Sequence, residues 1–359
     1  MTSLTASGIK RRRNTNELTT KVLAYGLIVL LVVWLFMNLM KAPSTFVTVF
    51  FDGLRMGSLY ALIALGYTMV YGIIQLINFA HGDLFMLGSV FAGTSIAFIF
   101  GQFGATVGEF GTPSAPTLFV GITALILSLI GSMVFCGGIN YAVERLAYRR
   151  LRSAPKLAPL ITAVGVSFVF QFIGLTWNGS GPQSWIPVMP RTNLVLGDVT
   201  IKHNTLIILA LTIPLLLALT FLVKKTRQGR AMRATAEDQD AARLMGVNVN
   251  RTISFTFMLG GALAGAAGLM YQQMIATTNY NLGFRLGLIA FTAAVLGGIG
   301  NLTGAVLGGV LIGLISELNA GLPYGFGQRW GQSVVFIILI LLMVFKPEGI
   351  LGKPTTEKV

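Results

Sequence analysis

Long apolar stretches constrain this chain more than any other feature. They recur along the sequence, and at roughly 20 residues each is long enough for a helix to cross the hydrocarbon core of a bilayer. The chain has 359 residues, of which 54% are hydrophobic and 11% charged. A water-soluble domain of this size could not bury so much apolar surface. The spacing also differs from the short alternating segments of a membrane β-barrel. The sequence therefore predicts an all-α fold, a polytopic transmembrane helical bundle.

Eight to ten spans fit these stretches. The run at 22–40 exceeds a usual signal-peptide core and lacks a small-residue cleavage site after it, so we expect a retained first helix. The run at 286–319 fits either two crossings that turn at 297–301 or a re-entrant, broken-helix pair. Two crossings there would give ten spans. The other expected spans are 56–77, 84–103, 117–143, 157–177, 204–223, 252–275 and 332–345.

The loops between the spans carry fewer signals. We expect 41–52 to lie outside the membrane or at its interface. The loop at 178–203 is the longest external one, and its Val-Thr-Ile-Lys stretch from Val199 is typical of a small hairpin strand.

The formal charge of +14 is concentrated in four places. Residues 1–21, 145–156, 224–251 and 346–359 hold five, five, seven and three of the 26 Lys and Arg residues. These segments emerge on one side if the spans alternate, as the positive-inside rule requires of cytoplasmic segments. The charge therefore indicates topology and contact with anionic membrane lipid, and not a nucleic-acid partner. It divides the chain into a basic cytoplasmic N-terminal tail (1–21), a transmembrane domain (22–345) and a cytoplasmic C-terminal tail (346–359).

The segment 224–251 is the longest polar passage in the chain. Its middle, 230–246, favours a short helix, because it is rich in alanine and ends at a glycine suited to a C-terminal turn. Small residues and mixed charge suit contact with another protein, although a solvated inter-helix loop is the alternative. The residues expected at such a contact are Glu237, Asp238, Ala241, Ala242 and Gly246.

A second polar passage, 75–83, interrupts two apolar runs. Charged side chains are costly at mid-bilayer, so such groups face a cavity or a partner. Broken helices are also where transporters place solute sites. A similar interruption occurs at 297–304. Three interpretations remain open for 75–83: a helix cap at Asp83, a lining role in the solute path, or a proton relay. The candidate solute-path residues are Gln75, Asn78, His81, Asp83 and Asn301.

The sequence carries no pattern for catalysis or for a bound cofactor. It has one cysteine, Cys136, and two histidines, so a zinc or iron–sulfur site is not expected. No Gly-x-x-x-x-Gly-Lys-Ser/Thr loop is present to cradle nucleotide phosphates. We therefore expect no enzyme, no metal site and no cofactor in this chain. If ATP drives it, the ATPase belongs to another polypeptide.

Three passages together resemble one family. They are GSLYALIALGYTMVYGIIQLINFAHGDLFMLGS (57–89), RATAEDQDAARLMGVNVNRTISFTFMLGGALAGAAGLM (233–270) and AFTAAVLGGIGNLTGAVLGGVLIGLISEL (290–318). They are similar to the H-type permease subunit of bacterial high-affinity branched-chain amino-acid ABC importers, and KPEGILGKP (346–354) fits as well. The resemblance runs from about residue 52 to the tail. It does not cover the basic N-terminal extension or the loop at 178–203.

The resemblance implies a function and a set of partners. The chain would be a non-catalytic permease subunit in the inner membrane, with leucine, isoleucine or valine as solute. It would assemble with an M-type permease, two cytoplasmic ATPases and a periplasmic amino-acid-binding protein, and 224–251 would be its ATPase-coupling loop. Urea or a short amide is an alternative solute within the same superfamily. An ion-coupled carrier that uses His81 and Asp83 is an alternative class.

Overall fold

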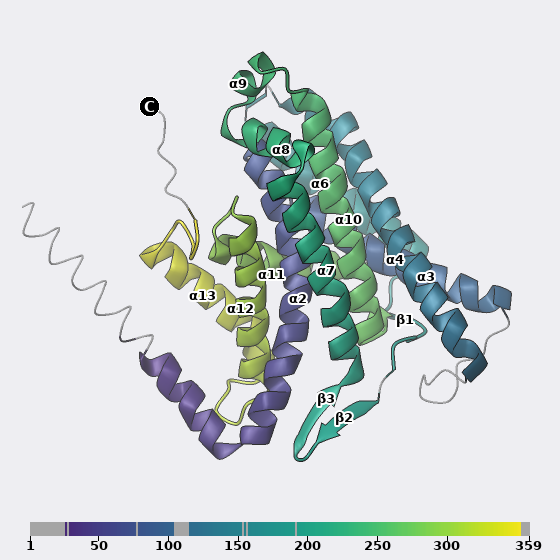
Figure 1. Ribbon diagram of the computed structural model, residues 1–359, viewed down its shortest axis with the longest axis vertical. Coiled ribbons are helices and arrows are strands. Elements are labelled where there is room, and N and C mark those ends of the chain that lie inside the picture. Colours follow the sequence, from purple (N-terminus) through teal and green to yellow (C-terminus); the bar gives the residue numbers. More distant parts are fainter. Residues whose placement is uncertain are drawn as a thin grey trace, which may run out of the picture.

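The computed structural model describes residues 26, 29–76, 78–103, 115–152, 154–155, 157–190 and 192–352. The predicted N-terminal tail and the second half of the predicted C-terminal tail, 353–359, lie outside these residues. Within them, the chain is a bundle of helices with two small antiparallel strand pairs (Figure 1).

Eight of the described helices are long and apolar enough to cross a membrane, and two shorter apolar ones, Val29–Lys41 and Leu282–Gly297, accompany them. This confirms the all-α membrane fold and the range of eight to ten spans. The candidate spans correspond to α2 (Pro43–Ile74), α3 (Ala80–Phe103), α4 (Ala115–Val143), α6 (Leu157–Asn178), α7 (His203–Lys225), α10 (Val249–Ile275), α12 (Leu302–Gly321) and α13 (Gly331–Phe345), the last together with the helical turn Gln328–Trp330 before it. The shorter helix Leu282–Gly297 is α11.

Helix α2 is longer than expected. It begins at Pro43, so most of 41–52 is helical and not a separate interfacial segment. Proline in the first turn favours that start, because its missing N–H would lack a helical partner there anyway. With 32 residues, α2 extends about 48 Å at 1.5 Å per residue, beyond the ~30 Å hydrocarbon thickness. Arg55 and Asp52 therefore lie within the helix, where they form an ion pair of 2.9 Å.

Small residues bring the central helices together. In the seam between α2 and α12, a Cβ at Gly57 would lie 2.7 Å from the Val310 Cα and 2.9 Å from its carbonyl oxygen. On α10, a face of small residues packs on α4 and α3, and a Cβ at Gly261 would lie 2.5 Å from the Cys136 carbonyl oxygen. Such approaches are the usual basis of helix association in membranes, where van der Waals packing replaces the hydrophobic drive. Helices α2 and α10 therefore form the buried centre of the bundle.

The ambiguous stretch 286–319 forms two helices. Helices α11 and α12 pack against each other and are joined by a turn at 298–301, which both predicted alternatives, two crossings and a re-entrant pair, contain. Gly298 and Gly300 have φ values of 102° and 92°, a conformation that side chains with a Cβ rarely adopt. With 16 residues, α11 is shorter than the ~20 residues of a full crossing.

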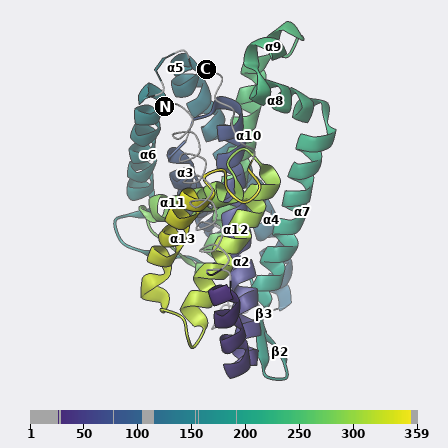
Figure 2. The ribbon, with the colours of Figure 1, turned by 90° about the vertical axis from the view of Figure 1, so that its left-hand side faces the viewer.

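The two ends of the bundle are distinct. One end carries the short helices α5 (Arg149–Leu151), α8 (Arg227–Glu237) and α9 (Gln239–Leu244), and we call it the α9 end (Figure 2). The opposite end carries the hairpin of β2 (Asn193–Leu196) and β3 (Val199–Lys202), with Leu194 opposite Ile201 (Figure 1). The hairpin predicted around Val199 is thus confirmed. A second pair joins β1 (Gln183–Ser184) to β4 (Thr277–Thr278).

Candidate functional site

The polar segment 224–251 folds as two short helices, which with the turn after them form an elbow (227–246). The expectation of a single helix over 230–246 is wrong. Asp238 has extended backbone angles, and its Oδ1 accepts hydrogen bonds from the Asp240 and Ala241 N–H groups at 2.9 and 3.0 Å. An N-cap side chain of this kind starts a new helix and so ends the previous one. Gly246 does make the predicted turn, with φ of 81°.

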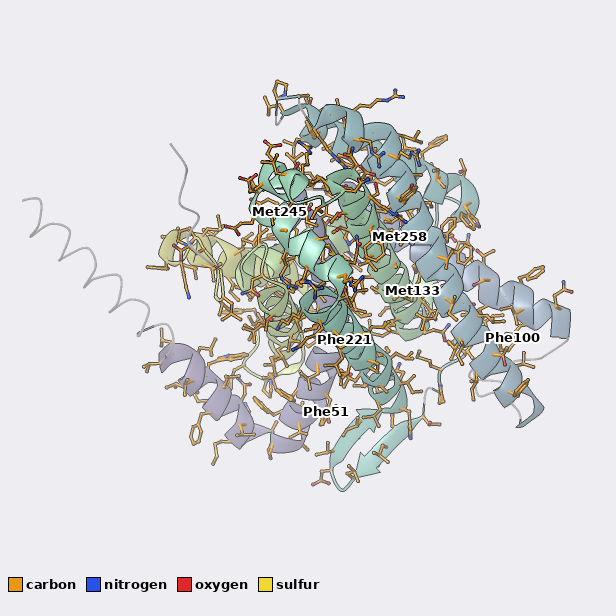
Figure 3. The ribbon with its side chains drawn as sticks, turned by 45° about the horizontal axis from the view of Figure 1, so that its top comes forward. Phe51, Phe100, Met133, Phe221, Met245 and Met258 are labelled. Carbon is orange, nitrogen blue, oxygen red and sulfur yellow. The ribbon has the colours of Figure 1, made fainter. Side chains whose placement is uncertain are left out.

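The elbow presents an exposed apolar tip. Leu244 is 89% exposed and Met245 85% exposed, next to the turn at Gly246 (Figure 3). Glu237 and Ala241 are also exposed, whereas Ala242 is buried inside the chain. Large apolar side chains that protrude from a polar segment indicate a protein-contact surface. The sequence interpretation named Ala241 and Ala242 and overlooked Leu244 and Met245, although the pair stands out before a glycine in a polar loop.

The inner side of the elbow rests on the end of α2. Gln239 Nε2 donates a hydrogen bond of 3.2 Å to the carbonyl oxygen of Ile73 in the last turn of that helix. A cavity of about 210 Å³ lies beside this contact, between 73–75 and 235–239. Gln75 ends α2 in a left-handed conformation, with φ of 53°. The elbow therefore touches the chain where its central helix breaks.

The break between α2 and α3 is held by Asn78. This side chain is buried, and its Oδ1 accepts a 2.8 Å hydrogen bond from the Tyr148 hydroxyl. Its backbone carbonyl accepts the His81 N–H at 3.1 Å, which starts α3. The predicted interruption at 75–83 is thus a real helix break, and it lies at the junction of α2, α3 and the segment that follows α4.

Asp83 faces helix α6. It is fully buried, and its Oδ2 accepts hydrogen bonds from Ser167 Oγ and, at 3.2 Å, from Gln171 Nε2. Helix α3 begins at Ala80, so Asp83 is in its first turn and is not its N-cap. The N-terminal turn of α11 lies on the other side, since a Cβ at Gly283 would be 2.6 Å from Asp83 Oδ1. A buried carboxylate thus joins three helices. Sequence reasoning missed Ser167 and Gln171, whose i, i+4 spacing on an apolar helix was the available signal.

His81 points away from Asp83. Its buried ring packs edge-on against Tyr67 of α2, with the ring centroids 4.8 Å apart, and a Cβ at Gly66 would overlap it. No hydrogen bond joins His81 to Asp83 within the described residues. Their arrangement therefore offers no direct proton relay between the two side chains.

Asn301 caps a helix at some distance along the chain from these groups. Its Oδ1 accepts the Thr303 and Gly304 N–H groups at 3.1 and 3.2 Å at the start of α12. Its Nδ2 donates to the carbonyl oxygen of Leu351 at 2.7 Å, which ties the C-terminal passage to the turn at 298–301. The turn lies near the end of α2, because a Cβ at Gly72 would be 3.7 Å from Gly300 Cα.

Comparison with known proteins decides the family. The family model described as "Branched-chain amino acid transport system / permease component" matches residues 49–344. The chain belongs to this family.

The alignments with curated relatives cover nearly the full length of those relatives. The high-affinity branched-chain amino acid transport system permease protein BraD of Pseudomonas aeruginosa is 39% identical over 313 residues, with 86% of this chain and 96% of the relative covered. LivH of Escherichia coli, with the same description, is 37% identical over 315 residues and has the same coverage. A probable branched-chain amino acid permease LivH of Methanocaldococcus jannaschii is 29% identical over 301 residues, with 82% and 89% covered.

The permease is thus a multi-pass membrane protein of a transport family. Among its described residues, no group of three or more His, Cys, Asp or Glu side chains is placed to hold a metal ion. The candidate site combines an exposed elbow, the helix break that the elbow contacts and the buried carboxylate of Asp83, which follows the break.

Proposed function

We propose that this permease is the membrane subunit of an ATP-binding-cassette importer that carries leucine, isoleucine or valine across the bacterial inner membrane. The names of its relatives support this class of solute. The single observation that carries the ATP-driven mechanism is the elbow, whose apolar tip is exposed while its inner side contacts the end of α2.

The elbow is the proposed ATPase contact. Leu244 and Met245 would enter an apolar groove of the ATPase, and Glu237 and Asp238 would pair with basic residues at its rim. A contact of this kind has an apolar centre and a polar border. The assembly would contain an M-type permease, two cytoplasmic ATPases and a periplasmic amino-acid-binding protein. The α9 end and both termini would then be cytoplasmic, in agreement with the basic residues of that end.

The route from the elbow to the solute path begins at Gln239. A displacement of the elbow would act through the Gln239–Ile73 hydrogen bond on the end of α2. The break at 75–79 would absorb the backbone rotation, because residues at element ends act as hinges. Movement of α3 would then change the contacts of Asp83 with α6 and α11. In this proposal Gln75, Asn78, His81 and Asp83 control the solute path, and Asn301 holds the neighbouring turn.

The test combines purification with transport. The full-length chain is extracted in mild detergent, the co-purified subunits are identified, and the assembly is reconstituted in liposomes with ATP and labelled leucine. We expect recovery of an ATPase and a second permease, and leucine uptake that requires ATP and a binding protein. Uptake by this chain alone without ATP would overturn the mechanism. Uptake of urea in place of branched-chain amino acids would overturn the proposed solute but not the ATP-driven mechanism.

A further inference from the structure

A basic cavity lies at the α9 end, between the end of α4 and the start of α10. It has a volume of about 520 Å³ and is lined at one edge by Arg145, Arg149 and Arg251. Asn248 and Asn250 complete the polar edge. The first turn of α10 also borders it, and a helix N-terminus favours negative charge.

None of the described residues that line the cavity is a carboxylate, and the nearby Glu144 is already engaged. Glu144 is fully buried, and its two oxygens accept hydrogen bonds from Arg149, Arg152 and Ser254. It therefore neutralises the inner arginines and does not reach the cavity. Arg145 is exposed and donates a hydrogen bond of 3.1 Å to the Tyr141 hydroxyl, and no ion pair of its guanidinium is found among the residues that the structure describes. Arg251 is also exposed, and no ion pair of its guanidinium is found within the described part of the chain. The cavity thus keeps a net positive charge.

The polarity of the lining changes along the helices. Arg145 lies in the turn that follows α4, and Tyr141 lies one turn deeper, on α4 itself. On α10, Arg251 is followed by Phe255 and Met258, four and seven residues further on. Met258 is exposed and lies on α10 beside α4 (Figure 3). The two helices approach closely at this depth, because a Cβ at Gly137 would be 3.0 Å from the Met258 carbonyl oxygen. The lining therefore runs from cationic to apolar in the direction of the membrane interior.

The apolar face continues below the cavity. Val134 and Ile130 lie seven and eleven residues before Tyr141 on α4, on the same side of that helix, and both are exposed. The arginines at the α9 end and the apolar face that continues from them along α4 match the charged headgroup and the acyl chain of an anionic phospholipid. A soluble anion would have no use for the apolar face. Basic pockets between transmembrane helices are a known means of holding anionic headgroups.

A local irregularity of α4 helps to build the cavity. Residues Glu144–Tyr148 form one π-helical turn, in which the Arg149 N–H bonds to the Glu144 carbonyl oxygen. Such turns insert one residue into a helix and often occur at functional sites. Here the turn lets Glu144 face Ser254 of α10 while Arg145 and Arg149 both line the cavity.

We propose that this cavity is a binding site for one anionic phospholipid, with its phosphate between Arg145 and Arg251 and an acyl chain along Tyr141, Val134 and Ile130. The cavity is lined neither by the elbow tip nor by Asp83, and the site does not depend on which solute is carried. The bound lipid would bridge α4 and α10 at the end of the bundle where the helices meet the elbow.

The test is retention of lipid by the full-length protein. The chain, with the subunits that co-purify, is placed in detergent and titrated with phosphatidylglycerol or phosphatidylcholine, and bound lipid is counted by native mass spectrometry. We expect phosphatidylglycerol to be retained and phosphatidylcholine to be lost. The R145Q/R251Q variant should bind phosphatidylglycerol about 30-fold more weakly, because each basic residue near a membrane surface contributes about fivefold.

Two matched variants separate charge from folding. R150Q removes an exposed arginine of the same segment that does not line the cavity, and it should bind as the unchanged chain does. R145K/R251K keeps the charge and should retain most of the binding. Equal binding by R145Q/R251Q and the unchanged chain would overturn the proposal.

Two further results would also overturn it. One is displacement of the lipid by free glycerol phosphate at equal concentration, which would make the cavity a soluble-anion site. The other is cross-linking of a Met258→Cys variant to a partner subunit in a lipid-free assembly, which would make the cavity a protein interface.

Discussion

Replacing Leu244 with alanine should weaken ATPase docking without weakening the fold. The side chain is 89% exposed, so it contributes little to the stability of the free chain, and the free energy of unfolding should change by less than about 0.5 kcal/mol. If a partner buries it, the substitution removes roughly three methylene-sized groups at about 0.8 kcal/mol each, or about 2.4 kcal/mol. That loss corresponds to about 50-fold weaker binding.

The assay is a titration of the co-purified ATPase against the permease in nanodiscs, together with leucine uptake. Leu196→Ala is the matched control, because Leu196 is an exposed leucine on the hairpin at the opposite end of the bundle. In Leu244→Ala we expect both ATPase affinity and leucine uptake to fall. In Leu196→Ala we expect ATPase affinity to be unchanged. Full ATPase affinity and normal uptake in Leu244→Ala would refute the assignment of the elbow tip.

Three other predictions concern the elbow contact with α2, the buried carboxylate and the seam between α2 and α12. Gln239→Ala removes the hydrogen bond to Ile73, so we expect ATP hydrolysis to continue while leucine uptake falls. An equal fall in ATP hydrolysis and uptake would contradict the proposed transmission of movement from the elbow to α2. Asp83→Ala should lower the free energy of unfolding in detergent by about 1.5–3 kcal/mol, because the hydrogen bonds that Ser167 and Gln171 donate to the carboxylate are lost, and equal thermal stability would contradict this. Gly57→Ala should lower it by about 1–3 kcal/mol through overpacking against Val310, whereas Gly138→Ala, with open space at its Cβ, should not.

The fold was largely predictable because bilayer thickness sets helix length. The apolar runs located the spans, and the glycine at 246 and the Gly-rich turn at 298–301 marked real chain reversals. Helix ends were less predictable. Composition marked the start of α2 too late, because an apolar segment can remain helical outside the hydrocarbon core.

The candidate site was predictable in position but not in contacts. The polar passage at 75–83 indicated a helix break, and the structure has one there. The partners of Asp83 and Asn78 lie on α6 and near the end of α4, and a sequence contains no distance between such segments. The bend at Asp238 was missed because alanine-rich composition favours continuous helix, while a single capping side chain overrides it.

The length of α2 has a consequence for how both membrane faces could respond together. One end of this helix holds the Gln239 contact, and near the other Asp52 pairs with Lys202 of β3, at 2.8 Å. Because the helix is unbroken between them, it is one rigid element that connects the α9 end of the bundle to the hairpin end. A tilt imposed at the elbow would therefore reach the hairpin without an intervening joint. Opening of the bundle at one membrane face and its closing at the other would then result from the same rigid-body movement of α2.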